Sequence, residues 1–203
     1  MTQIALPSSP VPLNLELGSS LQLSDDELFE LCARNPELWI ERTAEGDLIV
    51  MTPAGGASSH RNARITSELF RWADRVGGWL VFDSSMGFFL PNRAMRGPDA
   101  ACVLRSRVEA LAQEVREKFF PLCPDFVVEL RSQSDRLPPL RAKMEEYRDN
   151  GARLGWLIDP TERRVHVYRP GRTVEVLQDP AQISGDPELP GFVLDLAPIW
   201  KPL

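Results

Sequence analysis

The chain has 203 residues, of which 43% are hydrophobic and 26% charged, a composition typical of a globular protein. This length is enough for one sizeable hydrophobic core, so we expect a single domain over residues 21–203, preceded by an extended arm over residues 1–20. No apolar run reaches the ~18 residues that a membrane helix needs, and the N-terminus lacks a secretory signal pattern. The three scattered cysteines exclude a disulfide framework and, with only two histidines, a zinc site of the Cys/His type. We therefore expect a cytoplasmic protein with no membrane association.

The formal net charge of -6 disfavours a nucleic-acid partner when it is considered alone. The distribution of charge is more informative, because acidic residues dominate 1–50 and 172–203 while basic residues are in excess over 51–171. A nucleic-acid surface in the middle of the chain is permitted by this pattern, but it is not demanded.

The first part of the chain predicts a helix, a hairpin and a second helix. Ser24-Asp25-Asp26-Glu27 is a capping box that opens a short helix ending before Pro36. The segments 39–42 and 47–51 flank a glycine-containing turn and predict a β-hairpin. A loop of small residues over 53–59 then leads to a long helix over 60–76, which Ser59 is positioned to cap.

Apolar segments with strand character fill most of the remaining chain. They cover residues 79–82, 87–90, 100–104, 126–130, 155–159, 164–168 and 173–177, with a further edge strand expected within 191–200. Helical patterns cover 106–118 and 140–150. Strands gathered between helices predict an α/β fold with a mixed central β-sheet flanked by helices. His166 alternates with two valines, and we expect it to face solvent.

Two carboxylates stand at apolar strands where an uncompensated charge is costly. Glu129 interrupts the segment 126–130, and Asp99 precedes the segment 100–104. Acids at the ends of neighbouring strands can share one divalent ion, and Mg²⁺ binds through one or two carboxylates while keeping several waters. The Leu130 carbonyl is a further candidate ligand. Lys143, on the following helix, would position the attacking water or offset charge on a phosphate.

Each of these residues also has a simpler interpretation. Asp99 follows a proline and suits a turn at the start of a strand. Glu129 has nearby arginines as possible partners, and Lys143 has Glu146 on the same helix. The sequence leaves these alternatives open.

Several motifs taken together resemble a known family. They are Arg96-Gly97-Pro98-Asp99, the segment 124–132, Lys143 with Tyr147 and Gly151, the segments 156–160 and 165–168, Glu41 before a glycine hairpin, Met51-Thr52-Pro53, and His60. This pattern, spread over about residues 24 to 200, resembles a large bacterial family of uncharacterised restriction-type endonucleases in the PD-(D/E)xK nuclease superfamily.

The resemblance implies a restriction-endonuclease-like core with an N-terminal helix and β-hairpin, and metal-dependent DNA cleavage. It implies that Asp99 is the aspartate of the PD half and Glu129 the second acid. Arg131 occupies the usual lysine position, and in this family the lysine is displaced to the next helix, where Lys143 stands. Glu41 and His60 match auxiliary catalytic positions.

We therefore expect a hydrolase, a Mg²⁺-dependent endonuclease acting on DNA, in which Asp99, Glu129 and Leu130 bind the ion and Mn²⁺ can replace it. Cutting both strands of a duplex requires two active sites, which favours a homodimer or higher homo-oligomer. Arginines suited to phosphate contacts are Arg61, Arg64, Arg131, Arg136 and Arg141. The alternatives are a non-catalytic DNA-binding protein that retains the nuclease fold and a domain for protein interaction.

Overall fold

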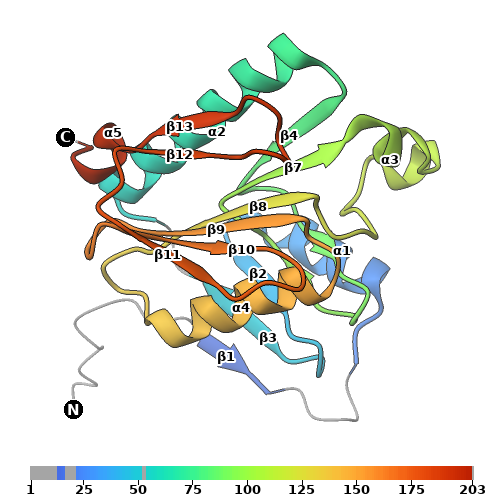
Figure 1. Cartoon of the computed structure of the whole chain (residues 1–203). Coiled ribbons are helices and arrows are strands. Elements are labelled where there is room, and N and C mark those ends of the chain that lie inside the picture. Colours follow the sequence, from blue (N-terminus) through green and yellow to red (C-terminus); the bar gives the residue numbers. More distant parts are fainter. Residues whose placement is uncertain (1–12, 17–21, 52–53, 203) are drawn as a thin grey trace, which may run out of the picture.

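The computed structural model describes residues 13–16, 22–51 and 54–202, and its centre is a six-stranded sheet. The strand order is β11-β10-β9-β8-β7-β4, with β8 and β9 parallel and all other neighbours antiparallel (Figure 1). The strands are β4 (Trp79–Asp83), β7 (Ala100–Leu104), β8 (Phe126–Leu130), β9 (Leu154–Asp159), β10 (Arg164–Tyr168) and β11 (Glu175–Gln178). The predicted mixed sheet is confirmed.

Helices cover both faces of this sheet. One face packs against α2 (Gly56–Val76), α5 (Ala197–Trp200) and a two-stranded sheet of β12 (Gln182–Ser184) and β13 (Val193–Asp195). The other face packs against α4 (Leu137–Asp149), which also connects the parallel strands β8 and β9 (Figure 1). Because side chains alternate along a strand, neighbouring residues of β8 enter separate hydrophobic clusters, one on each face.

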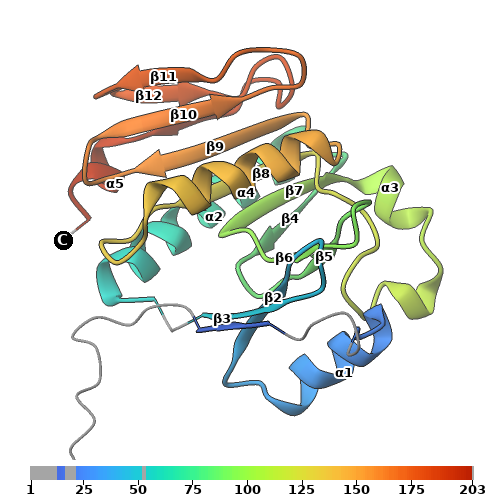
Figure 2. The ribbon, with the colours of Figure 1, turned by 90° about the horizontal axis from the view of Figure 1, so that it is seen from below.

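A second, smaller sheet carries the predicted hairpin. Its order is β1-β3-β2-β6-β5, and its strands are β1 (Leu13–Leu15), β2 (Trp39–Arg42), β3 (Leu48–Met51), β5 (Phe88–Phe89) and β6 (Met95–Arg96). Helix α1 (Asp25–Arg34) opens with the predicted Ser24 capping box and packs Leu28 against this sheet. Figure 2 shows the small sheet between α1 and α4.

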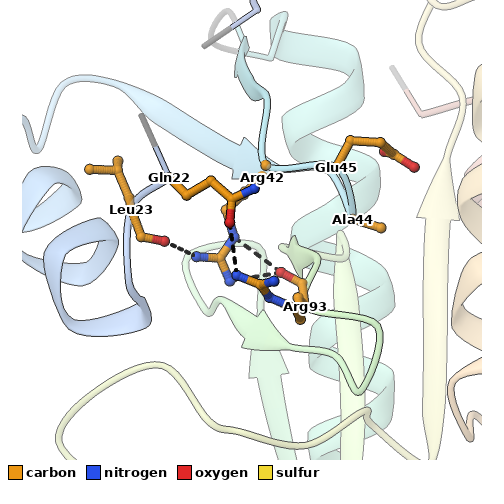
Figure 3. A pocket seen from close by; sticks show the side chains of 7 residues that line it. Gln22, Leu23, Arg42, Ala44, Glu45 and Arg93 are labelled. Carbon is orange, nitrogen blue, oxygen red and sulfur yellow. Dashed lines mark hydrogen bonds between the residues drawn. The ribbon is translucent and has the colours of Figure 1, made fainter. Parts of the chain in front are cut away.

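Arg42 anchors the N-terminal segment to the small sheet. Its guanidinium donates to the carbonyls of Leu23 at 2.8 Å and Arg93 at 2.7 Å, and it pairs with Asp25 at 2.6 Å (the carbonyl contacts are drawn in Figure 3). The Arg42 side chain is buried, so these contacts compensate the cost of removing its charge from water. Glu41 precedes Arg42 in β2, so the contacts of Arg42 also hold the strand that carries the Glu41 side chain.

Four sequence-based expectations differ from the structure. Helix α2 begins at Gly56 rather than at His60, with Gly55 as its N-cap, so Ser59 lies inside the helix. The segment 106–118 is not one helix but a short α3 (Arg105–Glu109) followed by a 3-10 turn η1 (Gln113–Val115). Within 191–200, β13 pairs with β12 in the separate small ribbon and not with the main sheet.

The fourth difference is His166, which is 2% exposed and not at the surface. Its strand β10 lies between β9 and β11, so α4 and the sheet cover it. Alternation along a strand separates the two faces, but it does not reveal whether the second face is also covered.

Part of the predicted arm is also structured. Leu13–Leu15 forms β1, which pairs antiparallel with β3, while residues 1–12 and 17–20 of the arm lie outside the described residues. Among the described residues, no helix is both long and apolar enough to cross a membrane.

Candidate functional site

Lys143 lies at the centre of a buried cluster of charged side chains. Its Nζ is 2.7 Å from Oε1 of Glu41 and 2.7 Å from Oε1 of Glu129, and it also donates to the Gly97 carbonyl at 3.3 Å. The three charged residues come from α4, β2 and β8, respectively. The structure thus brings together three of the residues that the sequence identified, across both sheets and a helix.

Glu129 reaches the cluster because of its place in β8. Its strand neighbours Val128 and Leu130 face α2, so Glu129 faces α4 together with Val127. Tyr147 of α4 donates its hydroxyl to Oε1 of Glu129 at 3.1 Å. Lys143 binds this same oxygen, and no described residue donates a hydrogen bond to Oε2. One carboxylate oxygen of Glu129 therefore remains available to a ligand.

Asp99 lies beside Glu129 at the end of β7. The register that pairs Ala100 with Val128 continues to place Asp99 opposite Glu129. Oδ2 of Asp99 accepts the backbone N–H of Leu130 at 2.7 Å. Because the N–H and C=O of one strand residue project to the same side, the Leu130 carbonyl also faces the Asp99 side.

Asn62 of α2 completes this end of the sheet. Its Nδ2 donates to Oδ1 of Asp99 at 2.6 Å, whereas its own Oδ1 is buried and has no hydrogen-bond partner among the described residues. Since the two heteroatoms of one amide are about 2.3 Å apart, the unpaired oxygen lies within about 5 Å of the Asp99 carboxylate. Leaving a buried acceptor such as Asn62 Oδ1 without a partner costs free energy, and a bound cation or water would remove this cost.

These oxygens fit the divalent ion that the sequence predicted. Among the described residues, no group of three or more His, Cys, Asp or Glu side chains is arranged to bind a metal. Two carboxylates, a main-chain carbonyl and an amide oxygen nevertheless form a hard-oxygen donor set, and Mg²⁺ binds through one or two carboxylates while retaining waters.

Burial and mutual repulsion perturb the acids of the cluster. The pKa of Glu129 is raised to about 8, because burial together with the charges of Asp99 and Glu41 outweighs the opposing effect of Lys143. Burial also raises the pKa of Asp99, although the Leu130 N–H, Lys143 and Asn62 oppose the shift. Burial acts in the same direction on Glu41, but Lys143 and Arg96 outweigh it, so the pKa of Glu41 is lowered.

A second cation, Arg96 of β6, also belongs to the cluster. Its Nη1 lies 3.1 Å from Oε2 of Glu41, and its Nε lies 2.5 Å from Oε2 of Glu146 on α4. Burial lowers the pKa of Arg96, but both carboxylates raise it by more, so the guanidinium stays charged. Asn92 donates to the other oxygen of Glu146 at 2.8 Å.

Two residues considered from the sequence are not part of this cluster. His60 is exposed near the start of α2, and among the described residues it has no hydrogen bond or ion pair with the cluster. Arg131 stands at the usual lysine position in the sequence, but its guanidinium pairs with Asp159 at 2.7 Å and makes no contact with Glu129 among the described residues.

Sequence reasoning missed the roles of Asn62, Arg96 and Glu146. Glu146 follows Lys143 by three residues and Tyr147 follows it by four, so helical spacing alone places all three side chains on one face of α4. That signal was present in the sequence. The contact between Asn62 and Asp99 had no such signal, because it joins a helix to the end of a distant strand.

Comparisons with known proteins agree with this fold. The chain is similar to a structure from Anabaena variabilis ATCC 29413 described as a "putative nuclease belonging to DUF820", with a TM-score of 0.74 and 21% sequence identity. The similarity covers 88% of this chain and 97% of that one, and it shows a shared restriction-endonuclease-like fold. No curated protein matches the chain. A family model described as "Putative restriction endonuclease" matches residues 25–197, most of the chain, and the protein therefore belongs to this family, Uma2.

Proposed function

We propose that this chain is a Mg²⁺-dependent endonuclease that hydrolyses phosphodiester bonds of DNA, with Mn²⁺ able to replace Mg²⁺. Membership of the family supports nuclease chemistry. The observation that carries the metal dependence is the charge of the buried cluster. Among the described residues, four acids of the cluster, Glu41, Asp99, Glu129 and Glu146, surround two cations, Lys143 and Arg96. With all four acids ionised, the excess of two negative charges matches one divalent cation, which would replace the proton that Glu129 otherwise binds below about pH 8.

Asp99 and Glu129 would bind the ion, together with the Leu130 carbonyl. When bound there, Mg²⁺ polarises a non-bridging phosphate oxygen and lowers the pKa of a coordinated water. Oε2 of Glu129 is the oxygen offered to the ion, because Lys143 and Tyr147 both bind Oε1. The N–H of Leu130 and the amide of Asn62 hold the Asp99 carboxylate in a fixed orientation beside it.

Lys143 supplies positive charge beside the phosphate. Its ammonium is directed at three oxygen acceptors, the arrangement of a hydrogen-bond donor and not of a base. In the reaction, this charge offsets the negative charge that develops as the 3′ oxygen leaves, or positions the attacking water once one of the three N–H donors exchanges its protein acceptor for that water. Glu41 assists by keeping the ammonium in place.

Exposed basic residues around the site are proposed to contact the DNA backbone. Arg64 on α2 and Arg136 and Arg141 near the start of α4 are exposed, and His60 lies on the exposed face of α2. Arg61 and Arg131 are less available, because Arg61 donates to the Ile199 carbonyl at 2.7 Å and Arg131 pairs with Asp159. Contacts of this kind are not sequence-specific and weaken as salt rises.

A homodimer would supply the two sites that duplex cleavage requires, and we propose this state for the active protein. Light scattering on the purified protein tests it directly. The three cysteines are free, which suits the reducing cytoplasm where we propose that it acts.

The deciding experiment is cleavage of plasmid and oligonucleotide DNA with Mg²⁺ or Mn²⁺. The parent is compared with Asp99→Asn, Glu129→Gln and Lys143→Met, and Glu188→Gln serves as the control. Glu188 pairs with Arg169 at 3.1 Å and is not part of the cluster, so this variant should cut at the parental rate. Loss of cutting in all three cluster variants is the expected result.

Two other outcomes would contradict the proposal. Cutting that persists in the cluster variants would assign the activity to other residues or to a contaminant. A folded parent that binds DNA in a salt-dependent way, with no cutting and no response to Mg²⁺, would favour the non-catalytic binding protein.

A further inference from the structure

We propose that Arg96 and Glu146 are positioning residues, which fix the Glu41 carboxylate and through it hold the Lys143 ammonium at Glu129. This inference rests on the proposed nuclease function for its kinetic test, but its structural basis is independent of that function. Neither residue is expected to touch the substrate or the metal.

The contacts form a closed ring through the small sheet and α4. Glu146 binds Arg96 at 2.5 Å, Arg96 binds Glu41 at 3.1 Å, and Glu41 binds Lys143 at 2.7 Å. Lys143 and Glu146 are one helical turn apart on α4, so the ring returns to the helix where it began. Such a ring fixes both the rotation of α4 about its axis and its position along the small sheet.

Arg96 is well suited to connect two carboxylates. Its guanidinium is planar, always charged, and offers donors in a rigid fork, so it can bind Glu41 through one nitrogen and Glu146 through another. A lysine at this position would present a single point charge and could not hold both carboxylates in the same geometry.

Without Arg96, the distribution of charge around Lys143 would change. Glu41 is 2% exposed, and among the described residues Lys143 would then be its one remaining cationic partner, in competition with Glu129. The ammonium would move toward Glu41 and away from Glu129. Arg96 therefore sets how the positive charge of Lys143 is shared between the two acids.

The same carboxylate also holds the segment that leads to Asp99. Oε1 of Glu41 accepts the N–H of Gly97 at 2.9 Å, in addition to the Lys143 ammonium. The orientation of Glu41 thus affects the placement of Lys143 directly and that of Asp99 through two residues of main chain. The Glu41 carboxylate, which Arg96 fixes, therefore positions Lys143 relative to Asp99, the proposed metal ligand.

The experiment compares Arg96→Lys and Glu146→Gln with the control Glu188→Gln, which alters a partly buried Arg–Glu pair outside the cluster. We expect kcat for DNA cleavage to fall about 10-fold to 100-fold in the two test variants, because a small displacement of a catalytic group has an effect of this size. KM for DNA and the Kd for Mn²⁺ measured without DNA should stay within about 3-fold, because the residues that bind them are intact. The control should match the parent.

A readout on Lys143 itself keeps the inference testable if the parent cuts no DNA. The chain has only three lysines, Lys118, Lys143 and Lys201, so NMR on protein labelled with ¹⁵N at the lysine side chains gives three such signals in the parent and in Glu146→Gln, and one more from the new side chain in Arg96→Lys. We expect the Lys143 signal to shift in Arg96→Lys and Glu146→Gln, and to be unchanged in Glu188→Gln. A Lys143 signal identical to the parental one in both test variants would overturn the inference, whether or not the protein is a nuclease. Full kcat in folded test variants would overturn it as well.

Discussion

The carboxylate of Asp99 accepts the backbone N–H of Leu130 at 2.7 Å, just beyond the last paired residues of β7 and β8. A side chain therefore continues the contact between two strands where their main-chain pairing ends. The same oxygen belongs to a residue that we propose as a metal ligand. Asp99 has two roles, one in closing the sheet and one in binding the ion, and substitutions can separate them.

Asp99→Asn should abolish metal-dependent cleavage and leave the protein folded. The amide oxygen can still accept the Leu130 N–H, and the unpaired Oδ1 of Asn62 can accept from the new amide nitrogen after that side chain rotates. Asp99→Ala leaves the Leu130 N–H without this partner and should lower the free energy of unfolding by about 1–3 kcal/mol. Urea denaturation of both variants, beside a cleavage assay, measures the two effects. Equal stability of the two variants would contradict the structural role.

Glu129→Gln should stabilise the metal-free protein at high pH and have little effect at low pH. Burial raises the folded-state pKa of Glu129 from its ordinary value of 4.5 to about 8, so the folded state binds this proton more tightly than the unfolded chain. The resulting stability is fully present below about pH 4.5 and is lost as pH rises towards 8. Glutamine does not ionise, so Glu129→Gln does not lose stability in this way as pH rises.

Unfolding followed at several pH values between about 5 and 9 checks this prediction. The advantage of Glu129→Gln over the parent should grow with pH by on the order of 1 kcal/mol or more, since each pKa unit corresponds to about 1.4 kcal/mol. Glu188→Gln should show no such growth. If the stability advantage of Glu129→Gln shrank as pH rose, the pKa of Glu129 would be lowered in the folded state and the prediction would be wrong.

Asn62→Leu should weaken Mn²⁺ binding about 10-fold without preventing folding. The substitution removes both the donor that orients Asp99 and the buried oxygen that has no protein partner. Calorimetry without DNA gives the Kd. Arg64→Gln, on the exposed side of the same helix, serves as the control: it should leave the Kd for Mn²⁺ unchanged and reduce the salt dependence of DNA binding. An unchanged Kd in Asn62→Leu would remove Asn62 from the metal site.

Gly97→Ala should lower both stability and cleavage. A Cβ atom at Gly97 would lie 2.8 Å from Cζ2 of the Trp39 ring, closer than atoms can pack without a shift. The displaced segment carries Asp99 and donates the Gly97 N–H to Glu41, so the site is disturbed together with the packing. We expect a loss of about 1–3 kcal/mol in the free energy of unfolding. Gly56→Ala on α2, where the new Cβ meets nothing within 4 Å, should have no such effect.

The sequence was sufficient to predict the sheet, most strands and the principal charged residues of the site. Strand periodicity located β7, β8 and β9, and an acid within an apolar strand identified Glu129. The sequence did not reveal that Glu41 and Glu129 both bind the Lys143 ammonium. That contact joins two sheets, and no local sequence pattern indicates how the two sheets are placed relative to each other. His166 was misjudged for a related reason, since the helix that covers its face is supplied by another part of the chain.

The bonds of Arg42 set a limit on how far the protein can be shortened from its N-terminus. Leu23 and Asp25 lie before or at the start of α1, yet they supply two of the contacts of a guanidinium buried in the small sheet. A chain that began at residue 26 would keep every strand of that sheet except β1 and would lose these two partners. The Arg42 charge would then depend on the Arg93 carbonyl and on Phe89, whose ring centre lies 5.5 Å away. We therefore expect a stable shortened form of this protein to retain the residues that precede its first helix.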